Sequence, residues 1–122
     1  MGKPSVRDVI AVPFPFSDLS HTKRRPALVV ASVEHGDVIL CQITSRYYAS
    51  KRALSIGSVD FVRGNLPMDS FARPGQLFTA SESIAVSVLG RLTDTRLRDI
   101  RQSNAALFQA RAVGGACDSR GT

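Results

Sequence analysis

Two apolar runs separated by a tight turn place the strongest restriction on the fold of this 122-residue chain. The first, residues 26–32, begins at a proline that directly follows three cations, and the second, residues 38–44, reads VILCQIT. Between them Gly36 can adopt the positive φ that a tight turn requires. A continuous apolar run is typical of a strand buried on both faces. Residues 26–44 therefore predict a central antiparallel hairpin.

Shorter apolar segments on both sides of this hairpin predict further strands. Residues 7–16 (RDVIAVPFPF) are β-branched and apolar. Pro13 and Pro15 close this strand because proline cannot donate to a sheet ladder, so the chain becomes an edge or bends out here. The other expected elements are short strands within 53–61, 75–80 and 84–90, and loops at 17–25 and 62–75.

A single helix is expected after the last strand. Thr93 can cap its N-terminus, and Leu97, Ile100, Leu107 and Phe108 then fall on one face at helical spacing. Many short strands finished by one helix predict a mainly β, β-rich α+β fold. The sheet is expected to be small, antiparallel and strongly bent, or closed into a barrel, with a C-terminal helix.

The length suits one domain with one core, which we place at residues 1–111, whereas residues 112–122 lack periodicity and are predicted to be disordered. No apolar run has the length of a membrane span, and the first residues lack the apolar stretch of a signal peptide. Cys41 and Cys117 lie far apart in dissimilar settings, which argues against a disulfide framework or a metal site. The cytoplasm is the default compartment.

The charge balance indicates the kind of partner. The net charge is +6 and the isoelectric point is near 10.2. Such a balance favours polyanions, either nucleic acid or an acidic protein segment, and is not specific by itself.

The usual signatures of catalysis are missing from the sequence. It holds no glycine-rich phosphate loop, no Cys or His cluster with metal spacing and no nucleophile elbow. His21 and His35 stand at opposite ends of the first apolar run, which argues against a two-histidine site within one chain.

What remains is a convergence of a guanidinium and a hydroxyl. Arg25 precedes the first run of the hairpin, and Thr44 and Ser45, followed by Arg46, stand where its partner leaves the sheet. In an antiparallel hairpin turning near Gly36, these positions lie side by side. A guanidinium matches the oxygens of a phosphate and stabilises growing negative charge, while a hydroxyl adds a donor. Cleavage of RNA needs little more, because the ribose 2′-OH is itself the nucleophile.

Solvation and turn formation also explain these residues. An arginine before proline often solvates a strand entrance, and Thr-Ser often forms a turn. Phe16 can stack on a base or pack into the core, and Lys51 with Arg52 can touch phosphates or be solvated. On the residues alone, the solvation reading stays ahead of catalysis.

Five segments, in order, resemble the MazF/PemK (Kid) family, the toxins of type II toxin–antitoxin modules. They are RDVIAVPFPF, with Arg7 where glycine is usual, KRRPALVV, ITSR, DSFARPGQL and LGRLTDTRL. The resemblance runs over about residues 7–108. It implies a compact SH3-like barrel with a terminal helix, acting as a homodimer. It also implies a metal-independent endoribonuclease, without cofactor, that cuts single-stranded RNA such as mRNA and leaves a 2′,3′-cyclic phosphate.

The resemblance also assigns roles to residues. Arg25 matches the family's catalytic arginine and Thr44 its catalytic threonine, and residues 17–24 match the loop that covers the substrate groove. Candidates for supporting roles in catalysis are His21, Ser45 and Asp18. Candidates for RNA binding are Lys23, Arg24, Arg46, Phe16, Lys51 and Arg52.

The implied partner is a cognate antitoxin whose acidic segment folds across the basic groove, with the complex binding DNA. Two other functions stay open for the same scaffold. One is a non-catalytic toxin that binds DNA gyrase, as the CcdB-like toxins do. The other is an RNA-binding module without cleavage, whose affinity falls with salt but yields no products.

Overall fold

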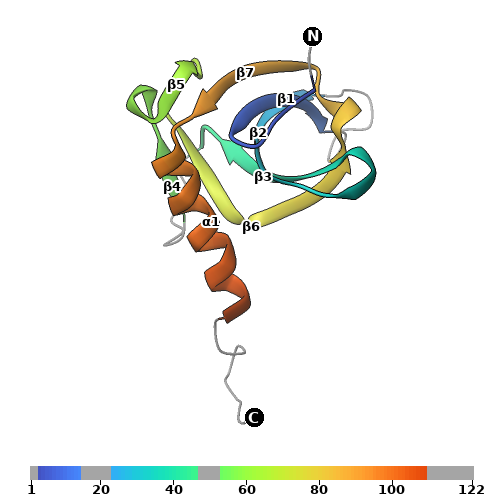
Figure 1. Cartoon of the computed structure of the whole chain (residues 1–122). Helices are drawn as coiled ribbons and strands as arrows, with labels where there is room; N and C mark the ends of the chain where they lie inside the picture. Colours follow the sequence, from blue (N-terminus) through green and yellow to red (C-terminus); the bar gives the residue numbers. More distant parts are fainter. Residues whose placement is uncertain (1–2, 15–22, 47–52, 110–122) are drawn as a thin grey trace.

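In the described part of the chain, seven antiparallel strands form one curled sheet, and a single helix packs against it (Figure 1). The computed structural model describes residues 3–14, 23–46 and 53–109. In space the strand order is β4-β6-β3-β2-β1-β7-β5. This arrangement confirms the predicted fold class, a mainly β SH3-like barrel with a C-terminal helix. The strands are β1 (Asp8–Phe14), β2 (Lys23–Ser32), β3 (Asp37–Thr44), β4 (Leu54–Ile56), β5 (Phe61–Gly64), β6 (Ser70–Ser81) and β7 (Ser87–Leu92), and the helix is α1 (Asp94–Gln109).

The central hairpin of β2 and β3 is confirmed. Leu28 lies opposite Cys41 in its ladder, and the whole run from Ala27 to Val30 is buried. A short 3-10 turn, η1 (Glu34–Gly36), joins the two strands, and Gly36 there has φ +75°. The apolar run is continuous because β2 has a neighbouring strand on each edge and a layer of side chains on each face.

Strand β2 begins three residues earlier than the sequence predicted. We expected a loop up to Arg25, yet Lys23 to Arg25 pair with the end of β1, where Arg25 faces Val12. Pro26 sits inside the strand because the β3 ladder starts one residue later, at Ala27, so the missing N–H of proline breaks no pair on that side. The three cations from Lys23 to Arg25 therefore belong to strand β2 and pair with β1.

Strand β1 begins at Asp8 rather than at Arg7. Arg7 has φ +84°, a left-handed conformation that ends the regular strand. At its other end Pro13 still pairs with Arg24 of β2, whereas pairing with β7 stops at Ala11. The proline thus faces a ladder on one edge only, as its missing donor requires.

The second half of the sheet differs most from the prediction. The expected loop at 62–75 is wrong, because it contains most of β5 and the start of β6. The expected strand at 53–61 is short β4 followed by the 3-10 turn η2 (Ser58–Asp60) and the start of β5, and the strand expected at 84–90 begins at Ser87, after η3 (Glu82–Ile84). Pro74 and Gly75 read as loop formers, yet they lie in a bulge within one long strand.

Two apolar clusters fill the two faces of the central strands. One packs against the helix and includes Leu28, Ile43 and Ile100. The other includes Ala27, Val29 and Leu40 and is covered by partly buried side chains of β6 and the following turn. Successive residues of β2 alternate between the clusters, as the period of a strand requires.

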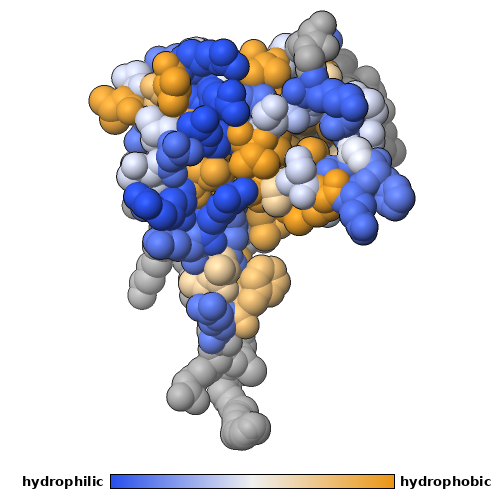
Figure 2. All heavy atoms as spheres, in the orientation of Figure 1, coloured by the Kyte–Doolittle hydropathy of each residue, from blue (hydrophilic) through white to orange (hydrophobic). Residues whose placement is uncertain are grey.

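The helix begins as predicted and ends differently. Thr93 accepts a hydrogen bond from the Arg96 N–H at 3.2 Å, which satisfies one of the free donors of the first turn. Of the residues predicted to share one face, Leu97 and Ile100 are buried, whereas Phe108 is 79% exposed. The C-terminal end of α1 extends beyond the sheet (Figure 1), and Figure 2 shows apolar surface near that end.

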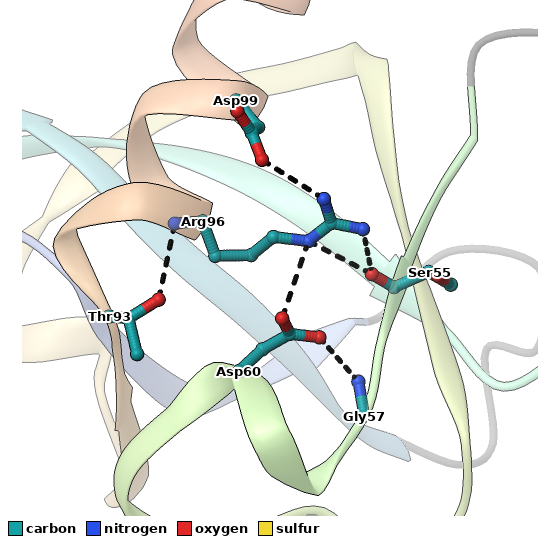
Figure 3. A network of polar contacts seen from close by, with 6 residues as sticks. All are labelled: Ser55, Gly57, Asp60, Thr93, Arg96 and Asp99. Carbon is teal, nitrogen blue, oxygen red and sulfur yellow. Dashed lines mark hydrogen bonds and ion pairs between the residues drawn. The ribbon is translucent and has the colours of Figure 1, made fainter.

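Two arginines join the helix to the sheet. Arg96 donates to the Ser55 carbonyl of edge strand β4 and forms ion pairs with Asp60 at 3.8 Å and Asp99 at 3.1 Å (Figure 3). Arg101 donates twice to the Val30 carbonyl, at 2.8 and 2.6 Å. The β2–β3 register shifts at Val30, and the guanidinium supplies the partner that the ladder leaves out there.

Candidate functional site

A cleft with a volume of about 380 Å³ opens where β2 begins and β3 ends. Its charged and polar lining comes from the start of β2, the end of β3 and the first residue of β6, and its apolar lining comes mainly from the segment between β5 and β6 and from β7. The lining residues are Ala11, Arg24, Arg25, Pro26, Ile43, Thr44, Ser45, Leu66, Pro67, Met68, Ser70 and Leu89.

The hairpin register brings Arg25 and Thr44 together at this cleft. The β2–β3 ladder ends at the pair of Ala27 and Gln42, each two residues from the site residue of its strand, and Arg25 and Thr44 both line the cleft. Counting outward from the turn predicted that Arg25 or Pro26 lies roughly beside residues 44–46. Cα atoms of directly opposite residues are about 5 Å apart, which a guanidinium spans easily.

The Thr44 hydroxyl is buried and oriented. Its side chain is 7% exposed, and its Oγ1 accepts a hydrogen bond from the backbone N–H of Arg46 at 3.1 Å. A hydroxyl that accepts one bond retains its own O–H for donation. The bond thus fixes the oxygen while a proton stays available to a ligand in the cleft.

The neighbouring arginines lie on opposite faces of β2, which the sequence did not suggest. Arg25 alternates with Ala27 and Val29, and Arg24 with Pro26 and Leu28. Arg25 therefore shares a face with Thr44, while Arg24 shares the face of the apolar cleft wall. Both side chains are exposed, as is that of Arg46.

The apolar wall of the cleft was missed by the sequence reasoning. Leu66 is nearly buried and Met68 is 60% exposed, and both belong to a segment that read only as a loop. The buried Ser70 hydroxyl donates to the Met68 carbonyl at 2.9 Å and shapes this segment. The sequence shows Leu66, Pro67 and Met68 as three consecutive apolar residues. It does not show that the chain fold brings them to β2.

Several predicted site residues lie outside the described part of the chain. They are Phe16, Asp18, His21, Lys51 and Arg52, and of Lys23 only the backbone is described. The predicted tail at 112–122 and Cys117 lie there too. Among the described residues, no group of three His, Cys, Asp or Glu side chains could hold a metal ion.

The cysteine of β3 is a buried, free thiol. Burial raises the pKa of Cys41 to about 11, against partial compensation by hydrogen bonds involving Asn104 and the Arg73 backbone. A thiol with so high a pKa stays protonated and is a poor nucleophile, so its place in the fold is structural.

The described part of the chain has no helix that is both long and apolar enough to cross a membrane.

Comparison with known proteins identifies the family. The family model described as "PemK-like, MazF-like toxin of type II toxin-antitoxin system" matches residues 5–108. The chain belongs to this family of toxins. No curated protein matches the sequence.

Solved structures share the fold at low identity. An endoribonuclease from a mycobacterial species, in complex with its cognate antitoxin, is 18% identical over 89% of this chain and 96% of its own, with a TM-score of 0.65. The MazE–MazF complex of Deinococcus radiodurans is 17% identical over 88% and 98%, with a TM-score of 0.70. The Mycobacterium tuberculosis toxin MazF-mt6 is 14% identical over 84% and 97%, with a TM-score of 0.65.

Proposed function

We propose that this toxin is a metal-independent, sequence-selective endoribonuclease that cuts single-stranded RNA. The observation that carries the proposal is that Arg25 and Thr44, from neighbouring strands, line the same cleft. Membership of the toxin family and the endoribonucleases among its structural neighbours support it.

The reaction is an internal transfer at phosphorus. The ribose 2′-oxygen attacks the adjacent phosphorus as its proton leaves, and the bond to the 5′-oxygen breaks as that oxygen gains a proton. The products are a 2′,3′-cyclic phosphate and a 5′-hydroxyl end. Negative charge grows on the non-bridging oxygens, and donors aimed at those oxygens lower the barrier most.

The cleft residues divide this work. Arg25 presents a planar set of N–H donors to two oxygens of the phosphorane, and Thr44 donates its O–H to the same group. Arg24 and Arg46 bind flanking phosphates, with Lys23, Lys51 and Arg52 extending this basic track. Ser45, His21 and Asp18 are proposed as supporting residues in proton transfer, and Phe16 as a stacking surface for a base.

Partners follow from charge and from the neighbours. One similar structure is described as a complex with its cognate antitoxin and another as a MazE–MazF complex, and this chain carries a net charge of +6. We propose a cognate acidic antitoxin that covers the basic cleft, a homodimeric toxin, and action in the cytoplasm.

The test uses the purified chain, a mixed RNA substrate and EDTA. We expect cleavage with EDTA present, and full protection of an oligonucleotide with 2′-deoxyribose at the scissile position, because its nucleophile is missing. Arg25→Ala should lower kcat/KM by at least about 100-fold, the usual cost of removing one donor to a developing oxyanion. The matched control is Arg63→Ala, an exposed arginine on edge strand β5, which should keep its activity.

Cleavage of the deoxy-substituted site, or equal activity of Arg25→Ala and wild type, would contradict the proposed roles. If no RNA is cut, gyrase supercoiling assays and salt-dependent RNA binding decide between the two non-catalytic alternatives.

A further inference from the structure

A bulge in β6 lies beside the proposed cleavage site. Ile43 pairs with Ala72, whereas Cys41 pairs with Leu77. Gln42 alone therefore stands opposite four residues of β6, at positions 73–76. Bulges next to functional sites commonly re-aim a side chain, and the first residue of this bulge is Arg73.

Hydrogen bonds anchor the bulge from the helix side of the sheet. The Cys41 thiol donates to the Arg73 carbonyl at 3.3 Å, and the buried Asn104 amide of α1 donates to the Pro74 carbonyl at 2.9 Å. With two successive carbonyls held on the inner face, the backbone of Arg73 has a defined position. The bulge is therefore a rigid base for the arginine that it carries.

The Arg73 side chain reaches across to β3. Its Nη1 donates to the Gln42 Oε1 at 3.1 Å, and both side chains are half-buried. Gln42 precedes Thr44 by two residues, so the two share a face of β3 about 7 Å apart. Thr44 and Arg25 line the cleft, and the Gln42–Arg73 pair lies outside its lining, next to Thr44 along this face of β3.

This pairing decides what the amide can offer to a ligand. A glutamine with both ends available binds adenine, accepting from its N6 amino group and donating to N7. Here the guanidinium takes one of the two lone pairs of the carbonyl oxygen, while both N–H groups of the NH₂ stay available, so the amide offers a ligand mainly donors. The positive charge behind it favours acceptor atoms further.

We propose that Gln42 is a base-reading residue of the RNA site, held by Arg73 as a positioning residue, and that it selects a base with two adjacent acceptors. In RNA these are guanine, through O6 and N7, and cytosine, through N3 and O2. On their Watson–Crick and Hoogsteen edges, adenine and uracil set a donor beside each acceptor and are disfavoured. The inference rests on the proposed function, since it assumes that RNA occupies the cleft.

The experiment measures base selectivity at each position next to the scissile bond. Oligonucleotides that differ in one base are used in two forms, a cleavable form for kcat/KM and a form with 2′-deoxyribose at the scissile site for binding. We expect one position where guanine or cytosine exceeds adenine by about tenfold in both measurements. Separate guanine and cytosine oligonucleotides show which of the two is preferred.

Two variants test the residues. Gln42→Glu replaces the donor by acceptors and should abolish or reverse that ratio. Arg73→Ala frees the amide to bind adenine and should bring the adenine ratio close to one. The control, Gln102→Glu, makes the same chemical change on an exposed position of α1 and should leave the ratio unchanged.

The outcomes separate this inference from the proposed function. Cleavage with an unaltered base ratio in Gln42→Glu overturns the inference and leaves the function standing. Selective binding without cleavage, altered by Gln42→Glu, supports the inference and removes the catalytic function. Absence of binding to every oligonucleotide overturns both.

Discussion

The arginines of the helix and those of the cleft occupy opposite chemical situations. Arg96 and Arg101 bind backbone carbonyls of the sheet, and Arg96 also pairs with carboxylates. The side chains of Arg24, Arg25 and Arg46 have no hydrogen bond or ion pair to another described residue. The same side chain thus supports the fold where its donors are occupied and suits an anion where they face solvent.

The sharpest test of this contrast compares Arg101→Ala with Arg25→Ala. Loss of Arg101 leaves the buried Val30 carbonyl without its partner, and we expect a fall of about 2–3 kcal/mol in the free energy of unfolding. Arg25→Ala should change it by less than about 0.5 kcal/mol, as exposed substitutions do. Urea denaturation measures both. Equal losses in the two variants would show that the contrast is false.

A smaller change in the free energy of unfolding is expected at Arg7, whose side chain is bonded while its backbone is in the left-handed region. Its guanidinium contacts the Leu92 carbonyl and Asp94, at 3.3 Å each, but its backbone has φ +84°. Arg7→Gly and Arg7→Ala both remove the side-chain bonds, and only glycine relieves the backbone. The glycine variant should therefore be more stable than the alanine variant by about 1 kcal/mol in urea denaturation. A more stable alanine variant would mean that the backbone is relaxed here.

Cys41, whose thiol donates to the Arg73 carbonyl in the bulge, predicts that the stability of the fold depends on pH. The pKa of Cys41 is near 11 in the folded protein against 9.0 ordinarily, because burial disfavours the thiolate. Stability from the protonated thiol is complete below pH 9 and is lost as pH rises towards 11, since the unfolded chain releases the proton first. Between pH 8 and 10 the wild type should lose about 1 kcal/mol more than Cys41→Ala. Parallel curves for the two proteins would refute this.

The smallest effect concerns the flanking cations. Arg46→Ala should weaken RNA binding only a few-fold, because it removes one of several phosphate contacts. The slope of log K against log salt should become shallower by about 0.7, the value for one contact to a single strand. Titrations at several salt concentrations check this, with Arg63→Ala as the control. An unchanged slope would remove Arg46 from the binding surface.

How much could be predicted depended on whether the signal was local. The hairpin was predictable because a continuous apolar run and a glycine turn specify strand, burial and register together. The helix start was predictable from the capping Thr93. By contrast, the first part of strand β6, before the predicted strand at 75–80, was missed because Pro74 and Gly75 are local signals for a loop. Their place in a bulge depends on Asn104, thirty residues away.

The sequence by itself determined the central hairpin, its turn and hence the meeting of Arg25 with Thr44, because all of these follow from residues within one short stretch. Tertiary structure alone decided the rest of the site. It placed Arg24 and Arg25 on opposite faces, brought Leu66 and Met68 to the cleft, and set Arg73 against Gln42. These depend on pairing between distant strands, whose register is settled by packing of the whole sheet rather than by local preference.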